Sequence, residues 1–144
     1  MKNAVTFFLL AVIVVAIATK IVSLNMPSEP LEIHDGNHIV LCHSEIRCPT
    51  CQKMELRIES VLKEHEYADI GLVLLEYDRP QNHEFAERFH VGTLSIILLE
   101  QKNGKTVRFS DISGDAKNLI KNDEEFDGML KTRLNEFYGQ TRQQ

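Results

Sequence analysis

The side chains best suited to chemistry are two cysteines separated by two residues, in the motif Cys48-Pro49-Thr50-Cys51. The motif follows a short apolar run, a predicted buried strand, and it opens a predicted helix. Free backbone N–H groups at a helix N-terminus stabilise an anion, so we expect Cys48 to have a lowered pKa and to act as a thiolate nucleophile. Cys51, about one helical turn further along, is placed to resolve a mixed disulfide. The motif therefore predicts thiol–disulfide exchange.

Residues around the cysteines can support that chemistry. Arg47 adds positive charge beside Cys48. Pro49 suits the first turn of a helix, where no backbone N–H is needed. His43 and Glu45 lie on the approach to the motif, and for each the sequence allows either proton transfer or a merely structural or solvated role.

Other interpretations of the cysteines stay open at this point. Zinc sites use the same spacing, but structural zinc needs about four ligands, and neither a second CxxC nor an HxxxH pattern is present. A disulfide that only staples the domain is another possibility. Cys42, six residues before Cys48, is either a small core residue or a third sulfur. With Cys42, the pair would suit hand-over of a soft ion such as Cu(I), zinc or arsenite. We predict no resident metal or organic cofactor.

The first 24 residues carry the localisation signal. A lysine at position 2 precedes an apolar run over Ala4–Leu24 that is interrupted only by Thr6, Thr19, Lys20 and Ser23. The run is long enough, at about 20 residues, for an uncleaved membrane anchor. A signal peptide cleaved after Ala18 is the alternative. Either interpretation exports residues 25–144, as the extracytoplasmic domain of a single-pass membrane protein or as a secreted or periplasmic protein.

The charge of the exported part excludes some partners. Residues 25–144 hold all 21 Asp and Glu residues and all but two of the 16 Lys and Arg residues, which gives them a net charge of −7. A nucleic-acid-binding domain is expected to carry a clustered basic face. Binding to anionic lipid headgroups would also need positive charge. We therefore expect no nucleic acid and no lipid-surface docking, with membrane contact only through residues 4–24.

The exported part is predicted to be one α/β domain. Residues 25–36 contain two prolines and a glycine and are predicted to be a linker, with the domain over 37–138 and a short tail over 139–144. Strands are predicted at 38–43, 70–77, 93–100 and 105–109, and helices at 48–66, 82–89 and 123–138. Asn82 is a predicted helix cap, Asn103-Gly104 a hairpin turn, and Asn122 with Glu125 a capping box. The resulting order is β-α-β-α-β-β-α, with parallel early strands and an antiparallel final hairpin.

Two segments resemble thioredoxins. VLCHSEIRCPTC resembles the thioredoxin active-site strand and motif, and DRPQNHEFAERFHVGTLSIILLEQKNG resembles the stretch that leads into the third strand and the hairpin. This resemblance implies a thioredoxin-like three-layer sandwich with a mixed four-stranded sheet over about residues 37–138.

A narrower resemblance is to the nitrophenyl compound nitroreductase subunit family of ArsF type. It involves the membrane-proximal start, RCPTCQK, the strand around LSIILLE, the GKTVRF arm and the tail KNDEEFDGMLKTRLNEF. It implies an extracytoplasmic thiol relay that exchanges electrons with a membrane carrier of the DsbD/CcdA kind and with a client disulfide protein or reductase subunit. The family name links it to reduction or efflux of nitro-aromatic arsenicals. No Gly-rich fingerprint for a flavin or nicotinamide is present, so another subunit would have to bring such a cofactor.

Two positions depart from the thioredoxin pattern. Where thioredoxins have a cis-proline before the third strand, this chain has Ser95 after Leu94. A cis bond before a residue other than proline costs about 2.5–4 kcal/mol, so we expect a trans Leu94–Ser95 bond and an altered rim beside the cysteines. Cys42 stands where thioredoxins keep a buried aspartate that handles the proton of the inner cysteine. A thiol is a poorer proton acceptor, so another group would have to assist.

Overall fold

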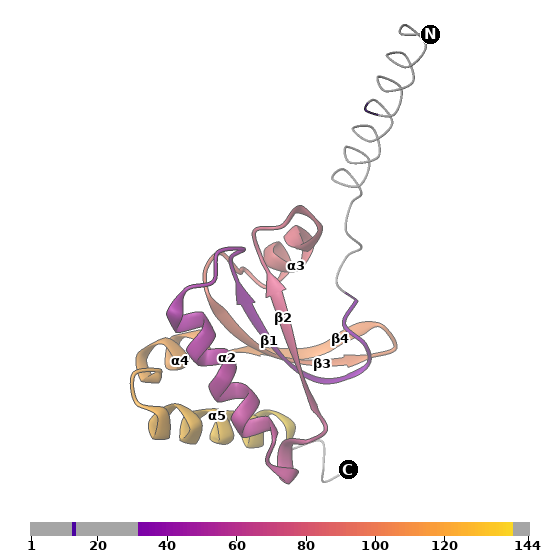
Figure 1. Cartoon of the computed structure of the whole chain (residues 1–144). Coiled ribbons are helices and arrows are strands. Elements are labelled where there is room, and N and C mark those ends of the chain that lie inside the picture. The colour runs from indigo at the N-terminus through magenta and orange to yellow at the C-terminus, as the bar shows by residue number, and fades with distance from the viewer. Residues whose placement is uncertain (1–12, 14–31, 140–144) are drawn as a thin grey trace, which may run out of the picture.

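The computed structural model of the chain describes residue 13 and residues 32–139 (Figure 1). The strands are β1 (Gly36–His43), β2 (Ile70–Glu76), β3 (Ser95–Lys102) and β4 (Lys105–Asp111), and the helices are α2 (Pro49–Leu62), α3 (His83–Arg88), α4 (Ser113–Leu119) and α5 (Asp123–Tyr138). Short 3₁₀ turns cover His65–Tyr67 and Pro80–Asn82. Apart from residue 13, the predicted anchor or signal segment over 1–24 lies outside the described residues. Within the described ranges, no helix has both the length and the apolar character needed to cross a membrane.

The four strands form one mixed sheet in the order β2-β1-β3-β4. β1 is parallel to β2 and antiparallel to β3, and β3 pairs with β4 as an antiparallel hairpin. At the hairpin turn Asn103 and Gly104 have φ angles of 54° and 69°, the left-handed conformation that a two-residue turn of this kind requires. The predicted sheet and the β-α-β-α-β-β-α order are confirmed, with one helix, α4, in addition.

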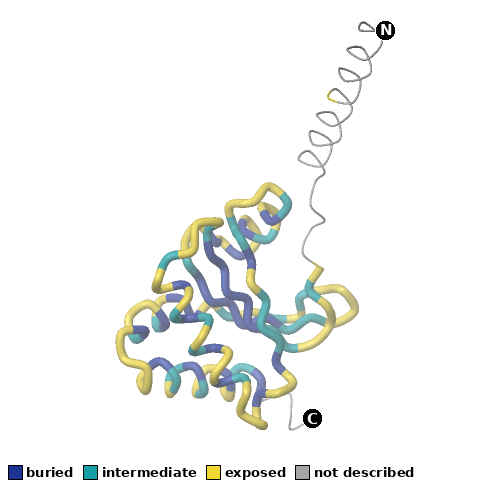
Figure 2. Tube along the Cα trace, in the orientation of Figure 1, coloured by how far each residue is buried: buried dark blue, intermediate teal, exposed yellow. Residues whose placement is uncertain are grey.

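Helices cover both faces of the sheet and make three layers (Figure 1). Successive side chains of a strand point to opposite faces, so β1 contributes to two cores. Ile39 and Leu41 pack in the larger core with residues of α2, α4 and α5. Val40 and Cys42 pack in the smaller core with residues of β2 and α3. All four side chains are fully buried, and Figure 2 shows the buried residues concentrated along these central strands.

Three local features differ from the sequence-based predictions. Helix α4 was not predicted, because Ser113–Leu119 is short and mostly polar; it is held by the buried Ala116 and by Ser113, whose Oγ accepts the Ile96 N–H at 3.0 Å. Helix α2 ends at Leu62 and not at residue 66. Asn82 does not cap α3 through its side chain; its Nδ2 donates instead to the Glu76 carbonyl at 2.9 Å and ties the turn to the end of β2.

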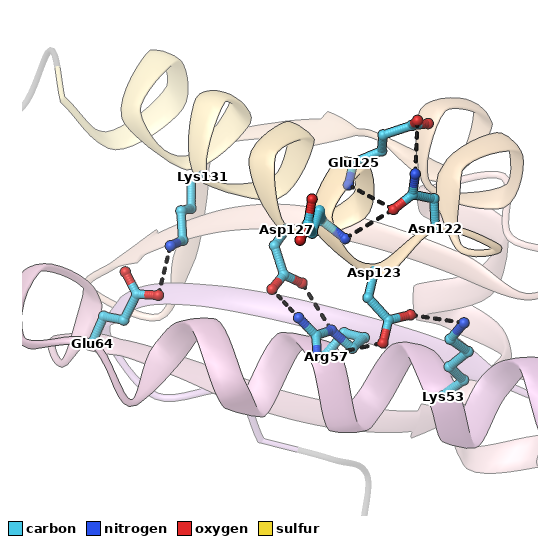
Figure 3. A network of polar contacts seen from close by, with 9 residues as sticks. Lys53, Arg57, Glu64, Asn122, Asp123, Glu125, Asp127 and Lys131 are labelled. Carbon is cyan, nitrogen blue, oxygen red and sulfur yellow. Dashed lines mark hydrogen bonds and ion pairs between the residues drawn. The ribbon is translucent and has the colours of Figure 1, made fainter.

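The start of α5 is capped by Asn122 (Figure 3). Its Oδ1 accepts the backbone N–H groups of Glu124 at 3.1 Å and Glu125 at 3.4 Å. Its Nδ2 donates to the Glu125 carboxylate at 2.8 Å, so the acid returns to the side chain of the cap and not to its backbone N–H. The predicted cap is confirmed, with this change in the second contact.

Ion pairs join α2 to α5 along their length (Figure 3). Lys53 contacts Asp123 at 2.8 Å, and the Arg57 Nε donates to Asp127 at 2.9 Å. These pairs lie at or near the surface, so their individual contributions to stability are small. They link α5 to the helix whose first turn carries the cysteines.

The residues just before β1 contact the opposite end of the sheet from the cysteine motif. The Asp35 carboxylate accepts the backbone N–H groups of Asn103 at 2.7 Å and Gly104 at 2.9 Å. These two hydrogen bonds lower the pKa of Asp35 below its ordinary value, and the bond from Gly104 has the larger effect. The chain therefore enters the domain at the β3–β4 turn.

Candidate active site

Cys48 and Cys51 lie side by side at the start of α2. Cys48 is the N-cap residue, and its Sγ accepts the backbone N–H of Cys51 at 3.2 Å. Pro49 occupies the first turn, as expected. The two Sγ atoms are 2.6 Å apart, and both cysteines are free thiols. The local sequence thus forms the helix start that orients both sulfurs.

The environments of the two thiols separate their acidities. Cys48 is half-buried, and hydrogen bonds from the Cys51 side chain and then from the Cys51 backbone lower its pKa. Cys51 is only 3% exposed, and burial, followed by its hydrogen bond to Cys48, raises its pKa. A thiolate is the reactive form of cysteine. The Cys48 sulfur is therefore suited to attack a disulfide, and the Cys51 sulfur stays protonated until it resolves the mixed disulfide.

Arg47 is adjacent to Cys48 in the chain, but its side chain is paired with a carboxylate and not with the Cys48 sulfur. Its guanidinium forms an ion pair with the Glu55 carboxylate, one turn beyond Cys51 on α2. No contribution from Arg47 is found among the causes of the lowered pKa of Cys48. The hydrogen bonds from the Cys51 side chain and then from the Cys51 backbone stabilise the thiolate. The pair joins residues eight apart in the sequence, so the i,i+4 spacing of helical ion pairs gives no signal for it.

The two candidates for proton transfer occupy different environments. His43 is 3% exposed, and its Nδ1 donates to the Ser44 carbonyl at 2.7 Å. Glu45 is exposed, and its backbone N–H donates to both oxygens of Asp78 at 3.0 Å. Asp78, in the turn that follows β2, therefore holds the loop that leads to the cysteines.

Ser95 and Leu94 lie at the same end of the sheet as the motif. Ser95 begins β3 and pairs with Cys42 on β1. Strand β1 ends one residue later, at His43, and the loop to the cysteine motif follows. Its Oγ donates to the Thr93 carbonyl at 3.0 Å, and Leu94 packs against the larger core. Among the described residues every peptide bond is trans, which confirms the expectation for Leu94–Ser95.

Cys42 belongs to the core of the domain. It is fully buried in the cluster on the α3 side of the sheet. Burial, with a smaller effect of the Asp111 charge, raises its pKa to about 12. Within the described ranges, no group of three or more His, Cys, Asp or Glu side chains is arranged to hold a metal ion. The structure thus does not assemble Cys42 with the other cysteines into such a group.

Comparisons with known proteins find only distant structural similarity. No protein-family model matches the chain, and no curated protein matches it. Solved structures similar to it include "Trxlp" from Edwardsiella tarda, with 20% identity, a TM-score of 0.41, and coverage of 57% of this chain and 84% of that chain. Mitochondrial thioredoxin 3 from Saccharomyces cerevisiae has 15% identity, a TM-score of 0.40, and coverage of 62% and 80%. Fasciola hepatica thioredoxin has 20% identity, a TM-score of 0.39, and coverage of 62% and 83%.

The order and directions of the strands match the thioredoxin-like fold that the sequence resemblance implies. The strand order β2-β1-β3-β4, the parallel β1–β2 pair, the antiparallel hairpin and the helices on both faces define an α/β sandwich of that kind. The cysteine pair lies where β1 gives way to α2. Fold alone does not define function, so the function is argued from the sulfur geometry.

Proposed function

We propose that this chain is a thiol–disulfide oxidoreductase that acts through Cys48 and Cys51. The observation that supports this most directly is the position of the Cys48 sulfur, which caps α2. It accepts the Cys51 N–H at 3.2 Å and lies 2.6 Å from the Cys51 sulfur. A structural disulfide needs no such polarity between its two sulfurs. A dithiol that exchanges electrons needs one thiolate to attack and one thiol close enough to resolve.

The proposed reaction balances without a further cofactor. The Cys48 thiolate attacks a substrate disulfide, so the Cys48–substrate S–S bond forms as the substrate S–S bond breaks. The leaving thiolate takes up a proton. Cys51 loses its proton and attacks Cys48 Sγ, which closes the Cys48–Cys51 disulfide and releases the second substrate thiol. The protein dithiol gives up two electrons and two protons, and the substrate disulfide takes them up.

The cellular setting extends the proposal. The apolar run over residues 4–24 supports a membrane anchor, or a leader cleaved after Ala18, with the domain outside the cytoplasm. Electrons would then come from or go to a membrane carrier of the DsbD/CcdA kind. The resemblance to the ArsF-type nitroreductase subunit family supports a client in the reduction or efflux of nitro-aromatic arsenicals. In such a system the flavin or nicotinamide would reside on another subunit.

Soft-ion hand-over is the second candidate function. The presence of two adjacent thiols at the start of α2 supports it, because thiolates select thiophilic ions such as Cu(I). It predicts a stoichiometric ion in protein purified under reducing conditions, and loss of that ion when either Cys48 or Cys51 is replaced by serine. Protein that is free of metal and still exchanges disulfides would exclude it as the main function.

A stoichiometric exchange assay tests the proposal. Reduced wild-type protein is expected to release two thiols per molecule of bis(hydroxyethyl) disulfide and to finish as an internal disulfide. Cys51→Ala is expected to release one thiol and to retain a hydroxyethylthio group, visible by mass spectrometry. Cys48→Ala is expected to retain little. Equal adducts on both variants would overturn the assignment of roles, and no adduct on either would overturn the proposed function.

A further inference from the structure

A pocket lies immediately beside the cysteine loop and plays no part in the exchange step described above. Its volume is about 320 Å³. It opens between the end of β1, the end of β2 and the turn that follows β2. Residues that line it include His43, Arg47, Leu74, Glu76, Arg79 and Asn82. Arg47 lines the pocket and directly precedes Cys48 in the chain, so the pocket borders the loop that carries the attacking cysteine.

The charges that line the pocket favour an anion. Two guanidinium groups, Arg47 and Arg79, face a single carboxylate, Glu76. Arg79 forms an ion pair with Glu76, and Arg47 pairs with Glu55, which is not among the lining residues. A guanidinium has five N–H donors, so one paired carboxylate leaves donors for a second. The lining therefore carries one positive charge in excess, in contrast with the net charge of −7 over residues 25–144.

The other lining groups suit a small organic ligand. Leu74 offers an apolar surface that is 38% exposed. The Nδ1 of His43 donates to the Ser44 carbonyl, so Nε2 is the ring nitrogen that is left for a ligand. Asn82 uses one N–H of its Nδ2 on the Glu76 carbonyl, and the amide has a second N–H donor. The volume lies at the lower end of the range of ligand pockets, about 300–1,000 Å³.

We propose that this pocket binds the carboxylate of a small disulfide or thiol substrate, with Arg79 and Arg47 as its cationic contacts, while Cys48 exchanges with the sulfur of that substrate. This inference rests on the proposed function and adds a substrate class to it. The carboxylate binds to the guanidinium groups, and the methylene chain that joins carboxylate to sulfur lies against Leu74. Bond changes and electron count are those of the exchange reaction given above.

A charge series of small disulfides tests the inference. The reduced full-length protein is mixed with dithiodipropionate, bis(hydroxyethyl) disulfide and cystamine, which are anionic, neutral and cationic compounds of similar size. Each rate is divided by the rate of free dithiothreitol with the same compound, which removes intrinsic reactivity. We expect the normalised rate to be highest for the anion and lowest for the cation. Because salt screens exposed charges, the preference should weaken as ionic strength rises.

Variants of one ion pair separate binding from structure. Arg79→Gln should lower the anion-to-neutral rate ratio about two- to fivefold, the range of an exposed charge contact. Glu76→Gln should raise that ratio, because it frees Arg79 for the substrate. Arg133→Gln is the matched control, since Arg79 and Arg133 are both ion-paired and both have side chains 44% exposed. It should leave the ratio unchanged.

Each outcome bears on a different claim. Loss of preference in Arg79→Gln with a gain in Glu76→Gln supports the pocket. A similar fall in both variants would mean that the ion pair is only structural and would overturn the inference. Equal normalised rates for all three compounds in the wild type would overturn the inference and leave the oxidoreductase proposal intact. If no compound reacts, both proposals fail.

Discussion

At the scale of single residues, the account depends on the contrast between Cys48 and Cys51. The two thiols have the same chemistry, but one caps a helix and the other is buried behind it. Their pKa values consequently move in opposite directions from the ordinary value of a thiol. The half-buried sulfur of Cys48 is the more acidic one, which is the order that directional exchange needs.

The pH dependence of alkylation tests this contrast. Only the thiolate reacts, so the rate of Cys48 alkylation by iodoacetamide should level off below the pH expected for an ordinary thiol, whose pKa is about 8.5. Cys51→Ala should shift the midpoint upward, because it removes the hydrogen bond that is the first cause of the lowered pKa. An unchanged midpoint in that variant would contradict the assigned cause.

Cys42 should behave as a core residue. It is fully buried with a pKa raised to about 12, so native protein should show no labelling at this position under conditions that label Cys48. Cys42→Ala should lower the free energy of unfolding by roughly 1 kcal/mol through lost packing. Denaturant titration and the disulfide exchange rate measure the two effects separately. A large loss of exchange rate at unchanged stability would instead support a role for the third thiol.

At the scale of elements, α4 shows how a polar segment can support the site. The Ser113 Oγ accepts the backbone N–H of Ile96, one residue after Ser95 at the rim of the site. The Ser113 N–H in turn donates to the Asp111 carboxylate at 2.8 Å. Helix α4 therefore completes the start of β3, where a buried N–H would otherwise have no acceptor.

Replacing that serine should be costly. Ser113→Ala leaves the Ile96 N–H without its acceptor, and an unsatisfied buried donor costs about 1–3 kcal/mol. Thermal and urea unfolding should show this loss. Ser110→Ala, three residues earlier on the edge strand, is the control and should change stability by no more than about 0.5 kcal/mol. Equal effects of the two substitutions would show that the Ser113 contact contributes nothing specific.

The elements that the sequence predicts well are those with strong periodic or turn signals. The strands around β1 and β3 are apolar runs, Asn103-Gly104 has the turn residues that a hairpin requires, and α5 has an apolar stripe with a cap at Asn122. Helix α4 has no such signal, because its seven residues are held by tertiary contacts with β3 and α5 and not by a periodic pattern of their own.

The candidate site also has some features that the sequence predicts and others that it does not. The cysteine pair and the helix that presents it follow from local sequence, because four adjacent residues define the capped turn. The pairing of Arg47 with Glu55, the anchoring of the Glu45 loop by Asp78, and the pocket at Arg79 depend on how β1, β2 and α2 meet. Side-chain partners of that kind are set by tertiary packing, and residue types alone do not specify them.

At the scale of the whole molecule, the cysteines and the entering chain lie at opposite ends of the sheet. Asp35 precedes β1 and is bonded to the β3–β4 turn, whereas Cys48 follows the other end of β1 (Figure 1). The domain therefore presents its sulfurs away from the point where residue 32 enters it. In an anchored protein, this arrangement would leave Cys48 accessible to a partner.

The central claim is that Cys48 and Cys51 cycle reversibly between dithiol and disulfide. The most direct test is the reduction potential of the full-length, metal-free protein, measured by equilibration in dithiothreitol or glutathione buffers. We predict one reversible two-electron transition that is abolished by Cys48→Ala or Cys51→Ala and retained in Cys42→Ala. A potential near about −270 mV would indicate a reductant, and one near about −120 mV an oxidant. A pair that does not cycle, or that resists reduction below about −300 mV, would contradict the account.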